Sequence, residues 1–378
     1  MRTLDEAREV CETRLPGLLG KLADIPLTDL EKPGNPGLEL FKAAGGPALV
    51  ISKDYEGLGV SPLEAIQVTR AIAAVSPSLA VASTMHHFSV ATIFTLADSL
   101  RSSGLEWALL EGIASQNLLV SSGFAEGNPG QGILSPTVGG VRKDGGIMVN
   151  GSKKPCSMSA SMDLLSASVS VPKDGGGTEN VAMLIPAATP GVSVHPFWRS
   201  NVLGGAESDE VRLTDVFVDE RLLVPTEVGD RGEVDELQTI GFMWFEMLIT
   251  ASYVGMASAL VERAFASPRL GTEIKADLGV RLETAALLLE GIGRQLIAKE
   301  GDNAALTKAM VARYGAQEAV VDVASMAVEA MGGMAFISSP DVAYLIAACQ
   351  CVNFHPPSRS ATRRALVENF TGDVLRIA

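Results

Sequence analysis

The sequence predicts an α+β fold, with an N-terminal helical domain, a middle antiparallel β-sandwich or barrel domain, and a C-terminal antiparallel helical bundle. Two patterns predict it. Short β-branched runs recur in the middle of the chain, separated by turns rich in Gly and Pro. Long stretches with a helical spacing of apolar residues follow Asp235. We expect domains at residues 1–112, 113–225 and 226–378.

The N-terminal domain is expected to consist of helices joined by loops. Charged and apolar residues alternate at helical spacing over Leu4–Leu22. The segment Asp29–Gly37, which contains two prolines and two glycines, interrupts this pattern. The apolar stretch Pro62–Leu96 then predicts two helices divided at Pro77, because proline cannot donate the backbone hydrogen bond that a helix interior needs.

The middle region carries turn signals and short strand patterns. Asp144-Gly145-Gly146 and Asn150-Gly151 predict two tight turns around the strand Ile147–Val149, because glycine readily adopts the positive φ of such turns. Further strands are expected at Asp163–Val171, Asn180–Ile185, Val192–Val194 and Glu210–Val218. This regular alternation of strands and turns is typical of an antiparallel sheet.

Three long helices are expected after the sheet, at Glu236–Ala266, Ala276–Glu300 and Ala304–Met331. The pair Gly332-Gly333 follows the third and suits a helix C-terminus. The longest uncharged run, Met247–Val261, is too short to span a bilayer and predicts a buried core helix.

The composition argues against several kinds of partner. With 44 acidic and 30 basic residues, the formal net charge is −14, whereas binding to a nucleic-acid backbone needs a basic surface. The four cysteines (Cys11, Cys156, Cys349 and Cys351) show neither a CxxC pair nor a disulfide framework, and Met1–Gly20 carries no signal-peptide pattern. We therefore expect a cytoplasmic protein with no nucleic-acid, membrane or metal partner.

Two segments of the middle region resemble motifs of a known family. The segment Ala125-Glu126-Gly127-Asn128-Pro129-Gly130 precedes Asn150-Gly151-Ser152-Lys153-Lys154-Pro155-Cys156-Ser157. They resemble the T-E-P-G-x-G-S-D and N-G-x-K-x-W-I-T/S motifs of the acyl-CoA dehydrogenase family, and the helix–β–helix order extends the resemblance to nearly the whole chain. The resemblance implies an FAD-dependent dehydrogenase that desaturates an acyl thioester of CoA or of an acyl carrier protein. Its mechanism would be proton abstraction and hydride transfer to flavin N5.

The resemblance also implies which residues bind the cofactor. The backbone of Phe124 and Ala125 and the hydroxyl of Ser157 would hold the flavin ring, since they occupy the corresponding motif positions. Gly332 and Gly333 match the loop by which a neighbouring subunit approaches FAD in the family. Together they predict an FAD site.

Other family positions are occupied here by different residues. His86 and His87 fall in the segment that lines the acyl pocket in the family; being adjacent on a helix, they point in different directions, so at most one faces the flavin. Gln131 replaces a serine that contacts CoA in many relatives. The family's R-x-x-F-G phosphate-binding motif is absent, and Arg269 is the nearest basic residue.

Two residues are candidates for the group that removes the substrate proton. The resemblance places His355 at the position where the family usually has a C-terminal Glu. Glu246 lies near a second family position, nine residues before Gly255 and one residue short of the family spacing. It is the only carboxylate in Ile240–Leu260, and a charge in so apolar a helix needs a partner or a function. We expect Glu246 to be the base, with a residue at the rim of the site or a structural partner as the alternatives.

Two other functions remain compatible with the sequence. A flavin monooxygenase on the same fold would use His86, His87 and His355 as polar groups of its pocket. A non-catalytic relative would bind no flavin tightly. For an enzyme, the family implies a homodimer or homotetramer that passes electrons to an electron-transfer flavoprotein or to oxygen.

Overall fold

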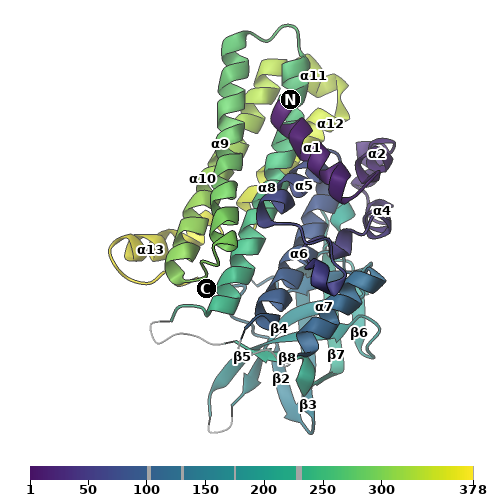
Figure 1. The fold of residues 1–378 in the computed structure, drawn as a ribbon, viewed down its shortest axis with the longest axis vertical. Helices are drawn as coiled ribbons and strands as arrows, with labels where there is room; N and C mark the ends of the chain where they lie inside the picture. The colour runs from purple at the N-terminus through teal and green to yellow at the C-terminus, as the bar shows by residue number, and fades with distance from the viewer. Residues whose placement is uncertain (100–103, 129–131, 174–175, 227–231, 378) are drawn as a thin grey trace.

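The computed structural model describes residues 1–99, 104–128, 132–173, 176–226 and 232–377. The molecule is elongated, with a bundle of long helices towards one end and a β-sheet at the other (Figure 1). Helices precede the sheet in the chain, and helices follow it. The mixed α+β class predicted from the sequence is therefore confirmed, while the three expected domain boundaries stay a prediction.

The helices described before the sheet differ in length, and α6, with 21 residues, is the longest of them. They are α1 (Arg2–Arg14), α2 (Leu18–Ala23), α3 (Leu27–Leu30), α4 (Gly37–Ala43), α5 (Pro62–Ala73), α6 (Pro77–Ala97) and α7 (Leu105–Gln116). Helix α5 starts with a capping box, in which the Ser61 hydroxyl accepts from the Glu64 amide and the Glu64 carboxylate accepts from the Ser61 amide. Pro77 occupies the first turn of α6, so the predicted division at this proline is confirmed.

The strands in the described residues form one sheet. They are β1 (Val120–Gly123), β2 (Gly139–Lys143), β3 (Gly146–Cys156), β4 (Leu164–Pro172), β5 (Thr178–Pro186), β6 (Val192–His195), β7 (Asp209–Asp219) and β8 (Leu223–Pro225). Their order is β6-β7-β3-β2-β4-β5-β8, and β1 pairs with β4 in parallel. The sheet is therefore mixed rather than purely antiparallel. β2 also pairs with β4 in parallel, and both parallel pairs are possible because intervening segments separate β1 and β2 from β4 in the chain.

One of the two predicted turns is observed and the other is not. Asp144 and Gly145 form a two-residue hairpin between β2 and β3, with φ of +73° at Gly145. Asn150 and Gly151 instead continue β3, where the register against β7 shifts. The Asn150 side chain accepts from the Asp215 amide at 2.8 Å and donates to its carboxylate at 3.0 Å. The residues predicted to reverse the chain thus form a β-bulge.

The C-terminal region consists of long helices followed by short ones. They are α8 (Glu236–Ala266), α9 (Thr272–Ile297), α10 (Asn303–Met331), α11 (Gly333–Ser338), α12 (Pro340–Gln350) and α13 (Arg359–Phe370). Helix α8 has the predicted bounds, because the Asp235 carboxylate caps its first turn and Ser267 is extended. Gly332 ends α10 with φ of +82°, as its predicted role at a helix C-terminus requires.

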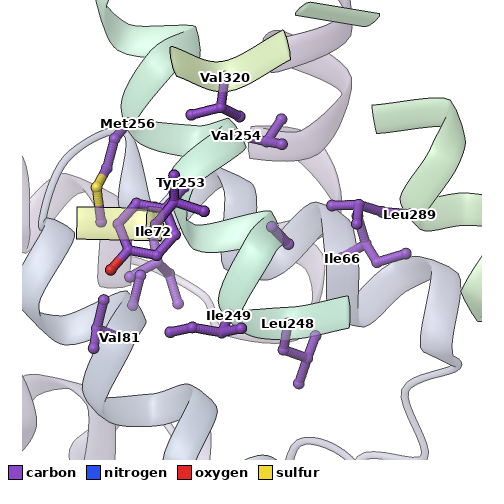
Figure 2. Packing of buried hydrophobic residues seen from close by; sticks show 14 of the residues in the cluster. Ile66, Ile72, Val81, Leu248, Ile249, Tyr253, Val254, Met256, Leu289 and Val320 are labelled. Atoms are coloured by element: carbon purple, nitrogen blue, oxygen red, sulfur yellow. The ribbon is translucent and has the colours of Figure 1, made fainter. Parts of the chain in front are cut away.

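Helix α8 is the centre of the main hydrophobic core. Figure 2 shows its Leu248, Ile249 and Val254 packed with side chains of α5, α6, α9 and α10. In the part of the chain that the structure describes, two helices, α6 and α8, are long and apolar enough to cross a membrane by length and composition alone. However, 72% and 94% of their most apolar windows are buried inside the protein. This burial agrees with the core helix that the sequence predicted for the α8 region.

Candidate active site

A cavity of about 180 Å³ lies between α6, the loop after β1, the first half of α8 and the segment that follows α12; it is called the site cavity below. Its walls are largely apolar, with a few hydroxyl groups and one imidazole. Side chains relevant to its chemistry are Met85, Phe88, Ser122, Phe124, Ser157, Trp198, Ser208, Phe242, Phe245 and His355. These residues come from widely separated parts of the chain.

Aromatic rings form much of the wall. Phe88 of α6 lies 5.3 Å from Phe245 and 6.3 Å from Phe124, measured between ring centroids. Phe242 and Phe245 are three residues apart on α8 and therefore share one helix face, with centroids 6.0 Å apart. Such rings offer flat apolar surfaces suited to a planar cofactor or an alkyl group.

The three residues predicted to hold the flavin ring lie on this cavity. Phe124 and Ala125 follow β1, and Ser157 follows β3. The Ala125 carbonyl accepts from the Lys154 amide at 2.9 Å, which ties the two segments together. The Ser157 hydroxyl lies 3.0 Å from that of Ser208, so two hydroxyl groups meet at one edge of the cavity.

A buried ion pair supports the loop after β1. Lys153 and Glu126 approach to 2.7 Å, with side chains 0% and 2% exposed. Glu126 also accepts from the backbone amides of Thr137 and Val138 at 3.0–3.1 Å. Burial lowers the pKa of Lys153. We did not predict this pair from the sequence, although Glu126 belongs to the first family motif and Lys153 to the second.

The imidazole of His355 faces the site cavity and bonds to Tyr253. Its Nε2 lies 2.5 Å from the Tyr253 hydroxyl, which is wholly buried on α8. Among the described residues this hydroxyl has no other partner, so it donates to Nε2 and leaves the imidazole proton on Nδ1. Burial, with a smaller effect of Arg313, lowers the pKa of His355 to about 3. The ring is therefore neutral, with Nδ1–H as its donor.

Glu246 is paired with Arg313 of α10 instead of facing the cavity. Its Oε2 accepts from Arg313 Nε at 2.9 Å, and both side chains are 0% exposed. Phe242 and Phe245 face the cavity, while Glu246 is turned roughly 100° further around α8 than Phe245. It is not among the described residues that line the cavity. Burial raises its pKa to about 7, against the opposing effect of Arg313.

The same guanidinium holds the segment that carries His355. Arg313 donates to the carbonyls of Val352 at 3.1 Å and of His355 at 3.3 Å, and it also bonds Gln317. The geometry therefore favours the structural partner, which the sequence left open as an alternative to a base at Glu246.

The two α6 histidines lie behind the cavity wall. His86 Nδ1 accepts from the Val120 amide at 3.0 Å, and its Nε2 donates to the Pro47 carbonyl at 2.9 Å. His87 packs edge-on against Phe41, with centroids 5.7 Å apart. Burial lowers the pKa of both, that of His86 to about 4. Neither is among the described residues that line the cavity, and His86 joins α6 to the sheet.

The remaining predicted residues lie elsewhere. Gly332 and Gly333 join α10 to α11, at the end of the bundle far from the sheet (Figure 1). Arg269 is exposed in the turn between α8 and α9. Gln131 lies outside the described residues. In this chain the glycine pair is thus separate from the site cavity.

One known protein is similar to this chain over the full length of both. No protein-family model matches the chain. Isobutylamine N-hydroxylase from Streptomyces viridifaciens is 44% identical over 378 residues, which cover 100% of each protein.

Several solved structures share the fold. FMN-bound TdsC from Paenibacillus sp. A11-2 matches with a TM-score of 0.79 at 19% identity, covering 100% of this chain and 99% of that chain. A nitrososynthase from Micromonospora carbonacea var. africana matches with a TM-score of 0.81 at 19% identity, covering 97% of each. The prolyl acyl carrier protein oxidase AnaB matches with a TM-score of 0.81 at 16% identity, covering 97% and 99%. At these identities the similarity shows the fold alone.

Proposed function

The chain belongs to the acyl-CoA dehydrogenase-like flavoproteins, in one family with isobutylamine N-hydroxylase, and on this basis we propose that it hydroxylates the nitrogen of a small aliphatic amine. The reaction would be R–NH₂ + O₂ + 2e⁻ + 2H⁺ → R–NHOH + H₂O. This is the monooxygenase alternative that the sequence left open. It is favoured here over desaturation of an acyl thioester.

The observation that carries the proposal is the chemical character of the site cavity. Its described lining contains no Asp, Glu, Lys or Arg, and its one titratable group is the neutral His355. Desaturation needs a base to remove a carbon-bound proton. The imidazole is unsuited to that role, since its Nε2 is bonded to Tyr253. An amine needs no such base, because its own lone pair is the nucleophile.

The apolar wall also selects the reactive form of the substrate. Transfer of an ammonium ion into a cavity without a counter-charge is costly, whereas a neutral amine enters readily. The cavity therefore favours the deprotonated amine, which is the form whose nitrogen can accept an oxygen atom. The polar groups that its described lining offers to the substrate are uncharged donors and acceptors, among them Ser122, Ser157 and Ser208.

The residues present fit a flavin ring. Hydroxyls at Ser157 and Ser208 and the backbone at Phe124 and Ala125 suit its polar edge, and the aromatic walls suit its faces. When bound in reduced form, the flavin supplies the electrons that activate oxygen. The Tyr253 hydroxyl would orient the His355 ring through Nε2, and the Nδ1–H of that ring would donate a hydrogen bond to the reacting oxygen.

FMN is proposed to suffice as cofactor, although FAD is the form expected from the sequence. The ring is common to both, and the residues at the site cavity that would hold it are the same for either cofactor. The additional AMP group of FAD would need phosphate contacts, yet the family's arginine motif is missing and Arg269 is exposed. Electrons would come from a separate flavin reductase instead of leaving to an electron-transfer flavoprotein.

A homodimer or homotetramer remains part of the proposal. Met334 and Ile337 on α11 are 72% and 76% exposed, and Phe370 on α13 is 66% exposed. Large apolar side chains exposed on the bundle helices would be covered by a second copy.

The test supplies reduced FMN or FAD anaerobically and then adds oxygen with isobutylamine. Mass spectrometry should detect the N-hydroxylamine, with the label of ¹⁸O₂ retained in it. The parallel experiment adds acyl-CoA or acyl-carrier-protein thioesters to the oxidised flavoprotein without oxygen. Bleaching of the flavin by a thioester, without any hydroxylamine in the first experiment, would establish desaturation and refute our proposal.

A further inference from the structure

A second cavity, of about 90 Å³, lies between α6, α7 and the sheet; it is called the side cavity below. Phe88, Thr92, Phe124, Ala182 and Leu237 line both it and the site cavity. The two spaces are therefore adjacent across these shared side chains, and a ligand that passed between the rings of Phe88 and Phe124 would reach from one into the other.

The interior of the side cavity offers little to a polar ligand. Of the three hydroxyls on its described wall, those of Ser89, Thr92 and Ser166, two are bonded within their own helix. Ser89 donates to the Met85 carbonyl at 2.9 Å, and Thr92 to the Phe88 carbonyl at 2.8 Å. Arg221, at 77% side-chain exposure, pairs with Asp219 at 2.9 Å. The charge of Arg221 therefore faces solvent. The half-buried Glu106 of α7 and the hydroxyl of Ser166 also line the side cavity, and the rest of its wall is aliphatic and aromatic carbon.

We infer that the side cavity binds the alkyl end of the substrate, whose amino group lies in the site cavity; this inference rests on the proposed function. A ligand held in both spaces would have its polar end in the site cavity, where the imidazole and the hydroxyls of Ser122, Ser157 and Ser208 gather. A primary alkylamine has this form. A group entering past Phe88 and Phe124 would leave its nitrogen on the side of His355.

The volume sets the length of the alkyl group. An apolar cavity of about 150 Å³ holds benzene. The side cavity, at about 90 Å³, therefore holds roughly three to four carbon atoms. Each methylene that moves from water into such a space tightens binding roughly fourfold. Binding should thus strengthen along a series of n-alkylamines and stop strengthening once the side cavity is full.

Two substitutions that touch the side cavity alone test this length limit. Ser166 on β4 and Leu109 on α7 line it and do not line the site cavity. Ser166→Leu fills the space with about three carbon atoms, and Leu109→Ala removes a similar number. Leu287→Ala is the matched control, because it makes the same deletion at a side chain that is 64% exposed on α9.

The dissociation constants of ethylamine to octylamine are measured by calorimetry on the flavin-loaded protein, without turnover. We expect the length at which binding stops improving to shorten in Ser166→Leu, to lengthen in Leu109→Ala and to stay unchanged in Leu287→Ala. Ethylamine should bind equally to all four proteins. Should Ser166→Leu fail to fold, the lengthening in Leu109→Ala still decides.

Two outcomes separate this inference from the proposed function. If the length limit is the same in the wild-type protein, Leu109→Ala and the control, the side cavity does not bind the alkyl group and the inference is wrong, even if amines are hydroxylated. If the limit shifts as expected while no hydroxylamine forms with reduced flavin and oxygen, the alkyl site stands and the proposed reaction is wrong.

Discussion

Replacement of Arg313 by methionine tests whether the buried network orients the segment that carries His355. Methionine fills a similar space but removes the bonds to Glu246, Gln317 and the carbonyls of Val352 and His355. Glu246 is then left alone in the core, where its carboxyl takes up a proton. We expect a less stable protein whose imidazole is no longer fixed.

The magnitude follows from burial, because both partners are 0% exposed. Breaking a fully buried ion pair by removing one partner costs about 3–5 kcal/mol. An unfolding entropy of about 2.1 cal/mol/K per residue over the 378 residues amounts to roughly 0.8 kcal/mol/K. The melting temperature should therefore fall by about 4–6 °C.

Differential scanning calorimetry measures this change, and Arg294→Met is the matched control. Arg294 pairs with Glu290 on the surface of α9 at 3.0 Å, with side chains 66% and 37% exposed, so its loss should cost less than about 1 kcal/mol. The double variant Arg313→Met with Glu246→Met should regain part of the stability. If Arg313→Met melts at the temperature of the control, the network does not hold this part of the fold.

Four further outcomes are expected. Glu246→Gln should retain N-hydroxylation within about tenfold; loss of the reaction at unchanged melting temperature would restore Glu246 as a base. Burial raises the folded-state pKa of Glu246 to about 7, from 4.5. Its contribution to the free energy of unfolding is therefore present below pH 4.5 and is lost as the pH rises through 7. Denaturant titrations at several pH values should show this decrease in the wild-type protein and not in Glu246→Gln. Tyr253→Phe removes the hydroxyl that donates to His355 Nε2. We expect slower N-hydroxylation and a ¹⁵N spectrum in which the His355 proton is no longer confined to Nδ1. An unchanged spectrum would contradict the tautomer assignment. His86→Ala should lower the unfolding free energy by about 1–3 kcal/mol while the folded fraction keeps its activity; an inactive but equally stable variant would place His86 in the chemistry.

The sequence predicted the helices better than the details of the sheet. Helix α8 has local signals at both ends, a capping aspartate before it and a Ser-Pro pair after it, so its bounds follow from neighbouring residues. The Asn150-Gly151 pair is locally ambiguous, because the same dipeptide suits a turn or a bulge. Its outcome depends on Asp215 in the distant strand β7.

In the site, too, the features that depend on neighbouring residues were predicted better than those that depend on distant ones. Phe124, Ala125, Ser157 and His355 lie on one cavity, as the motifs led us to expect. The partner of Glu246 could not be identified from the sequence, since Arg313 is 67 residues away on another helix. On α8, Phe245 faces the cavity, whereas Glu246, one residue later, faces α10. Counting residues from a motif is uncertain by one position, which is enough to turn a side chain roughly 100° around the helix.

The site cavity takes its walls from residues as far apart in the chain as Val81 and Pro356. During synthesis on the ribosome, the helices around α6 and the whole sheet emerge long before His355 does. A nascent chain can therefore fold its sheet without possessing an enclosed place for a flavin, and contacts over such separations form late. We therefore expect flavin to bind after the C-terminal segment has been made, because a product that ends before His355 lacks part of the cavity wall.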